Sequence, residues 1–160
     1  MMTNELALIS PGRSEEIPEA ADVYGWLIGS WHLDVRRFGD AAKYSGAGEV
    51  HFARVLEGRA IQDVWIMPNT YGTTLRVWDA GVQAWRITWI NPVTGARDEM
   101  VGRRIGEEIV QVGTHSDGTP IRWIFSEITP DSFRWTGEAL EPDGRTWRLE
   151  AEFRARRLTA

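Results

Sequence analysis

The sequence contains no cysteine. That absence excludes disulfide bonds, thiol catalysis and zinc–thiolate sites together. No apolar run approaches the length that crosses a membrane, and no charged-then-apolar leader stands at the start of the sequence. We therefore expect a cytoplasmic protein without membrane insertion.

An excess of positive charge is also missing. The formal net charge is −5 over 160 residues, and the arginines alternate with apolar residues along the chain rather than forming a patch. Nucleic-acid-binding domains usually carry a basic patch or stripe. Nucleic acid is therefore not an expected partner.

The residue patterns of common catalytic and metal sites are absent too. The three histidines, His32, His51 and His115, lie on separate predicted strands or turns, whereas metal sites need clustered ligands. There is no nucleophile elbow and no glycine-rich phosphate loop. We expect neither a metal nor a cofactor.

What the sequence does have is nine tryptophans and a long series of alternating apolar and polar residues from Trp31 onward. Such alternation is typical of half-buried strands. We predict strands over residues 31–38, 44–56, 59–67, 72–79, 83–91, 97–105, 108–115, 120–128, 132–140 and 145–156.

Short turn sequences link the predicted strands, so consecutive strands are expected to pair with one another. Such a meander has two exposed edges unless it closes. The predicted fold is all-β: a single closed up-and-down antiparallel barrel of about ten strands. A barrel of that size has room for a ligand cavity.

The N-terminal part reads differently. Residues 1–17 are irregular and charged, which predicts a flexible arm before a barrel domain over 18–160. Residues 18–26 begin with a proline and a glutamate, which favour a helix start, so we expect a short helix that caps one end of the barrel.

The parity of the strands predicts which side chains face inward. The aromatic residues expected inside are Trp85, Trp89, Trp123, Phe125, Trp135, Trp147 and Phe153. The residues of the last strand expected in solvent are Arg148, Glu150, Glu152 and Arg154. His115 precedes an Asp-Gly turn and is expected to be exposed.

Polar residues on inward faces are the candidate site residues, since a buried polar group needs a partner or a ligand. Asp63 shares its strand face with Trp65. On the following strand either Leu75 and Val77 or Arg76 and Trp78 point inward, and in the second case Arg76 faces Asp63. A structural ion pair is the simpler interpretation of Asp63 and Arg76. The predicted ligand-binding residues are Asp63, Trp65, Arg76, Trp89, Asn91, Trp123 and Trp135.

Three functions fit this pattern. The first is binding of a small hydrophobic molecule, aromatic or polyketide-like, in a Trp-lined cavity. The alternative is a cofactor-free isomerase, cyclase or decarboxylase in the same cavity, with Asp63 as general base and Arg76 holding an anionic oxygen. In the third, the tryptophans fill the barrel, and function lies on loops or at a homodimer surface. Whether the protein forms a homodimer in the other two cases is left open.

The segment Gly29-Ser30-Trp31 at the head of the first strand resembles the opening motif of lipocalins and their calycin relatives. With residues 85–92, 121–125, 128–135 and 143–147, it also resembles a bacterial group of uncharacterised lipocalin-like small proteins. The resemblance implies that Trp31 plugs the closed end of the barrel under an arginine of the last strand, for which Arg156 or Arg154 is expected. It implies no particular activity. Nitrobindin-like barrels bind haem through a late histidine, and no histidine follows His115, so haem is not expected.

Overall fold

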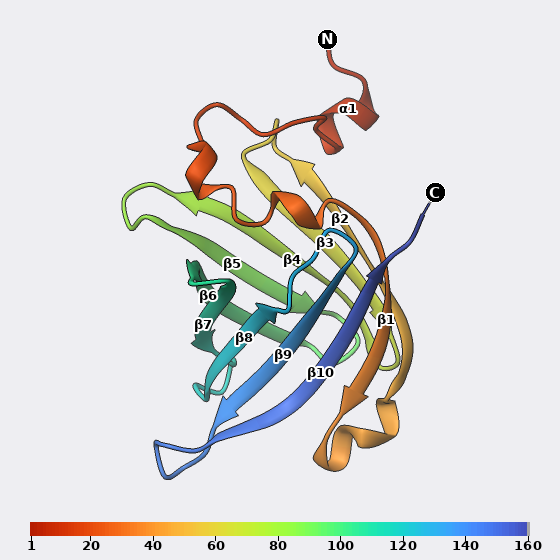
Figure 1. Cartoon of the computed structure of the whole chain (residues 1–160), viewed down its shortest axis with the longest axis vertical. Helices are drawn as coiled ribbons and strands as arrows, with labels where there is room; N and C mark the ends of the chain where they lie inside the picture. The colour runs from red at the N-terminus through yellow and green to blue at the C-terminus, as the bar shows by residue number, and fades with distance from the viewer. Residues whose placement is uncertain (160) are drawn as a thin grey trace.

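The computed structural model describes residues 1–159 and shows ten antiparallel strands closed into one barrel (Figure 1). Each strand pairs with the next along the chain, and the first pairs with the last. The strands are β1 Gly29–Arg37, β2 Gly46–Val55, β3 Ala60–Met67, β4 Thr70–Asp79, β5 Ala84–Asn91, β6 Ala96–Ile105, β7 Glu108–Thr114, β8 Pro120–Ser126, β9 Ser132–Leu140 and β10 Trp147–Arg157. The predicted all-β, ten-stranded closed barrel is confirmed.

Alternation along the strands produces the core, as β1 illustrates. Trp31 and Leu33 are fully buried and Val35 is 3% exposed, whereas Asp34 between them is exposed. Trp31 pairs with Val50 on β2 and with Arg157 on β10. Because paired residues of neighbouring strands face the same side of a sheet, the inward set continues around the barrel.

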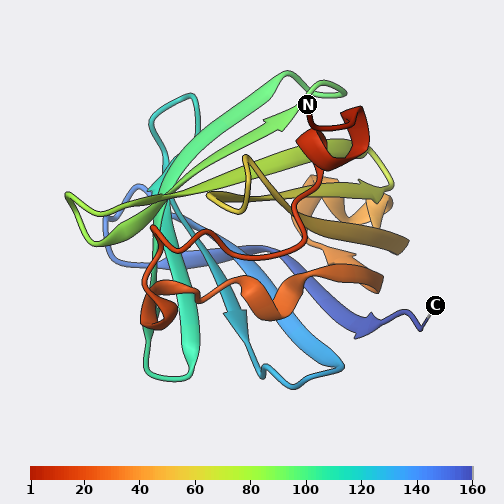
Figure 2. The ribbon, with the colours of Figure 1, turned by 90° about the horizontal axis from the view of Figure 1, so that it is seen from above.

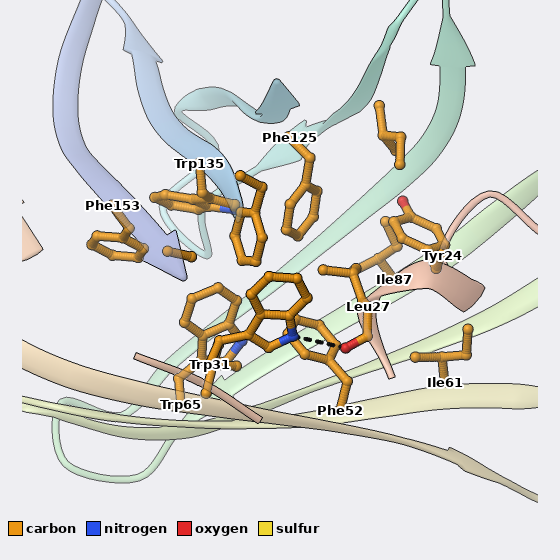
Figure 3. Packing of buried hydrophobic residues seen from close by; sticks show 14 of the residues in the cluster. Tyr24, Leu27, Trp31, Phe52, Ile61, Trp65, Ile87, Phe125, Trp135 and Phe153 are labelled. Atoms are coloured by element: carbon orange, nitrogen blue, oxygen red, sulfur yellow. Dashed lines mark hydrogen bonds between the residues drawn. The ribbon is translucent and has the colours of Figure 1, made fainter. Parts of the chain in front are cut away.

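One end of the barrel is closed by the segment before β1, which crosses that end in Figure 2. Two 3₁₀ turns, Glu19–Ala21 and Gly25–Leu27, stand where a single capping helix was expected. Tyr24 and Leu27 are fully buried, and Trp31 Nε1 donates a hydrogen bond of 2.8 Å to the carbonyl oxygen of Leu27 (Figure 3).

The arginine over Trp31 is Arg157, and the expectation of Arg156 or Arg154 was wrong. Its guanidinium carbon lies 4.1 Å from the centre of the indole ring. The pairing of Trp31 with Arg157 explains the difference, because the inward face of β10 runs through Phe153 and Ala155 to Arg157.

The first residues lie against the same end. The only α-helix among the described residues, α1 (Asn4–Leu8), has no buried residue. Further along, Ser10 pairs with Arg54 of β2 and Ile17 is buried. The division into a 1–17 arm and an 18–160 domain stays a prediction, and residue 160 lies outside the described residues.

A β-bulge in β10 changes which residues face inward near its start. The pairing with β9 shifts between Leu149 and Ala151, so Glu150 is the extra residue. Trp147 then lies on the outer face, 4.2 Å from the Arg122 guanidinium, and its expected inward position was wrong. Glu150 instead reaches the inner cavity, so its expected place in solvent was also wrong.

Within residues 1–159, none of the helices is long and apolar enough to span a bilayer.

Candidate functional site

A cavity of about 290 Å³ occupies the barrel at the end opposite the closed one. Its mouth lies among the turns after β1, β3, β5 and β7, near the 3₁₀ helix Gly39–Tyr44. Figure 1 shows this helix, in orange, at the lower right. The third sequence-based hypothesis required a barrel interior filled by its own side chains. The cavity shows that the interior is not filled.

Five aromatic residues line the cavity: Trp65, Trp89, Trp123, Trp135 and Phe153. These rings contact one another in a continuous chain. Trp135 and Phe153 are stacked with ring centres 4.5 Å apart, and Trp123 lies 5.4 Å from Trp135. Trp89 adjoins Trp123, and Trp65 adjoins both Trp135 and Phe153. The rings come from five strands, β3, β5, β8, β9 and β10, and offer flat apolar surfaces to a ligand.

The cavity floor holds a buried ion pair. Arg76 lines the cavity, and its Nη1 lies 2.5 Å from Oδ2 of Asp63. The other carboxylate oxygen of Asp63 accepts a 2.7 Å hydrogen bond from the backbone N–H of Thr74. Both side chains are 1% exposed or less. The pair places a charge-balanced polar group at the base of an aromatic cavity.

Further partners fix the Arg76 guanidinium in place. Its Nε donates a 3.1 Å hydrogen bond to Oε1 of Gln111, which also accepts one of 3.1 Å from the Tyr24 hydroxyl. Burial raises the pKa of Tyr24, so the phenol stays protonated and acts as a donor. The guanidinium also lies over the rings of Tyr24, Phe52 and Phe125, at 5.0, 5.8 and 5.7 Å. Such cation–π contacts stabilise a buried arginine.

Next to Arg76 along the inward face of β4, the Thr74 side chain lines the cavity. Thr74 is 1% exposed, and among the described residues its hydroxyl has no hydrogen-bond partner. Buried hydroxyls almost always have a partner in native proteins. This hydroxyl is therefore a candidate ligand contact.

A charged cluster lies on the cavity wall nearer the mouth. The imidazole of His115 stands between two carboxylates, with Nδ1 3.1 Å from Oδ2 of Asp98 and Nε2 3.2 Å from Oε1 of Glu150. Hydrogen bonds to Asp98 and then Glu150 raise the pKa of His115 to about 10. The His115 side chain is 30% exposed, so its expected exposure was wrong.

This cluster was not among the predicted site residues. Strand parity is a signal that could have found two of its residues, because His115 falls on the same face as Gln111 of β7 and Asp98 falls on the inward face of β6. Glu150 carried no such signal, because only the bulge turns it inward.

Six of the seven predicted ligand-binding residues line the cavity: Trp65, Arg76, Trp89, Asn91, Trp123 and Trp135. Asn91 is at the rim, where its side-chain oxygen accepts a 3.0 Å hydrogen bond from the N–H of Val93. The seventh residue, Asp63, does not line the cavity, and both of its carboxylate oxygens are engaged. The open question of which β4 face points inward is settled in favour of Arg76 and Trp78.

In the part of the chain that the structure describes, no three His, Cys, Asp or Glu side chains converge on a metal position. The geometry of the His115 cluster shows why, since the two imidazole nitrogens point toward different carboxylates.

Comparison with known proteins identifies no family for this chain. No family model matches the sequence, and no curated protein matches it. Among solved structures, the chain is similar to one from the de novo design of a fluorescence-activating β-barrel. The two are 18% identical with a TM-score of 0.33, over 86% of this chain and 98% of the other. A likeness at that level carries no information on ligand or activity.

Proposed function

We propose that this protein binds a small hydrophobic molecule with an aromatic ring system in the barrel cavity. The observation that carries the proposal is the chain of contacting aromatic rings along the wall of a cavity that is open at its mouth and is not packed solid. Ligand pockets are typically lined by apolar and aromatic side chains with a few polar groups, and span roughly 300–1,000 Å³. A cavity of about 290 Å³ is at the small end of that range, which favours a ligand of two or three fused rings.

The proposal includes the lipocalin-like character of the barrel. It is supported by the closed end, where Gly29 adopts a positive φ of 124° just before Trp31 and Arg157 covers the indole. This is the arrangement that the resemblance of the sequence implied.

The enzymatic alternative, with Asp63 as general base, has less support. A general base must reach the proton that it abstracts. Both oxygens of Asp63 are already paired, and Asp63 does not line the cavity. The geometry of this ion pair therefore favours its structural role.

The test is a titration with naphthalene, followed by calorimetry and by the Trp emission of the protein. We expect saturable binding of naphthalene and weaker binding of decalin, its saturated counterpart, because stacking needs flat rings. Ala151 lines the cavity, so Ala151→Phe should fill the space and abolish binding.

Ala47→Phe makes the same change on the exposed outer face of β2 and should bind naphthalene like the parent. The proposal is wrong if naphthalene and larger fused-ring compounds do not bind, or if Ala151→Phe binds them as tightly as Ala47→Phe does.

A further inference from the structure

The cavity floor has hydrogen-bonding capacity that the protein itself does not use. The Thr74 hydroxyl is buried and lacks a partner among the described residues, although it lines the cavity. Leaving a buried donor or acceptor without a partner is costly, and proteins generally avoid it outside functional sites.

Arg76 adds a second donor on the same face of β4. Its hydrogen bonds to the described part of the chain use Nε and Nη1. A guanidinium has five N–H groups in a rigid fork, so the Nη2 amino group stays available to a ligand. Thr74 and Arg76 are two positions apart on one strand and both line the cavity, so a single ligand group can reach both.

The charges around the cavity determine what that group can be. Arg76 is already neutralised by Asp63. Nearer the mouth, the carboxylates of Asp98 and Glu150 are matched by protonated His115 and by Arg37, which also lines the cavity. The lining groups and Asp63 thus sum to zero, and burying another charge in this cavity would be unfavourable.

We propose that the cavity selects neutral aromatic ligands that carry a carbonyl oxygen at their inner end, which Thr74 and Arg76 hydrogen-bond together. This inference rests on the proposed function and names its ligand class: aromatic ketones, aldehydes, lactones or quinones. The ring system lies against the tryptophan wall, and the oxygen points away from the mouth toward β4.

The experiment compares two probes of nearly the same shape, 2-acetylnaphthalene and 2-isopropenylnaphthalene. The first carries a carbonyl oxygen where the second carries a methylene group. We expect 2-acetylnaphthalene to bind at least about tenfold more tightly, as one or two hydrogen bonds to a buried donor allow. The anion 2-naphthoate should bind more weakly than 2-acetylnaphthalene.

The variant Thr74→Val keeps the shape of the side chain and removes the hydroxyl. It should reduce the preference for 2-acetylnaphthalene several-fold and leave binding of 2-isopropenylnaphthalene unchanged. Thr88→Val is the matched control, because Thr88 is on the outer face of β5 beside Leu75. That variant should keep the full preference.

The outcomes separate the two proposals. If neither probe binds and naphthalene does not bind either, the proposed function itself is wrong; if naphthalene binds and neither probe does, only the carbonyl-selective floor is refuted. If both bind equally, or if Thr74→Val keeps the preference, the aromatic cavity stands and the carbonyl-selective floor is refuted. Tighter binding of 2-naphthoate than of 2-acetylnaphthalene would refute the charge-balance argument and the neutral ligand class with it.

Discussion

Arg157 and Trp31 join the last strand of the barrel to the first at its closed end. The guanidinium lies 4.1 Å from the indole ring centre and donates hydrogen bonds to the carbonyl oxygens of Trp26, Ile28 and Pro130 at 2.8, 2.9 and 3.0 Å. One side chain therefore holds the capping segment, β1 and the β8–β9 turn together.

Replacing Arg157 by alanine should lower the free energy of unfolding by about 2 kcal/mol, since it removes the stacking contact and three charge-assisted hydrogen bonds at a partly exposed site. Chemical denaturation measures the change. Arg156→Ala is the control, because Arg156 is exposed on the outer face, and its effect should stay within about 0.5 kcal/mol. Equal effects of the two substitutions would contradict the role of Arg157.

Trp31 itself should matter more. It is fully buried and packs against Phe133, with ring centres 4.8 Å apart, and against Trp26. Trp31→Ala should cost about 3–5 kcal/mol, as for other large core aromatics. A variant that melts like the parent would contradict the arrangement at the closed end.

The buried pair of Asp63 and Arg76 predicts a strongly non-additive result. Asp63→Asn leaves the Arg76 charge buried without its partner and should cost about 3–5 kcal/mol. Replacing both residues by apolar ones, in the double variant Asp63→Val with Arg76→Met, should recover much of that loss. A double-mutant cycle by urea denaturation measures the coupling. If the double variant is as unstable as the sum of the single ones, the two groups do not act as a pair.

The stability of the protein should depend on pH through the protonation of His115. The pKa of His115 is about 10 in the folded protein, against an ordinary value of 6.5, because its imidazole hydrogen-bonds to Asp98 and Glu150. A raised folded-state pKa means that the stabilisation is complete below about pH 6.5 and is lost as the pH rises toward 10.

The measurement compares urea unfolding of the parent and of His115→Gln between pH 6 and pH 10. The parent should be the more stable at pH 6, and the difference should shrink progressively toward pH 10. A difference that stays constant over this range would show that protonation of His115 does not contribute.

The sequence predicted the barrel well because its signals are local. Alternation and turn residues identify strands and their links, and short links determine neighbouring pairs. The same parity placed Trp89, Trp123 and Trp135 on the inner face, where all three line the cavity. What local patterns could not show was which inward residues would pack and which would leave space between them.

The missed residues have particular causes. Arg157 follows the parity of Phe153 and Ala155 and could have been chosen on that ground. Glu150 could not have been placed on the inner face from the sequence. The one extra residue in β10 reverses which residues face inward before the bulge, and nothing in the local sequence signals that bulge. The pairing of His115 with Asp98 and Glu150 depends on three strands and on that bulge, so only the closed barrel brings them together.

The bulge also makes a testable distinction between two tryptophans that look alike in the sequence. Trp85 is 1% exposed and packs in the core, whereas Trp147 stacks on Arg122 at the outer face. Trp85→Ala should cost about 3–5 kcal/mol. Trp147→Ala should cost about 1 kcal/mol, since a partly exposed cation–π contact contributes roughly 0.5–1 kcal/mol. Thermal or urea unfolding measures both, and naphthalene binding by Trp147→Ala should match the parent because Trp147 lies outside the cavity. Equal destabilisation by the two substitutions would place Trp147 in the core and contradict the bulge at Glu150.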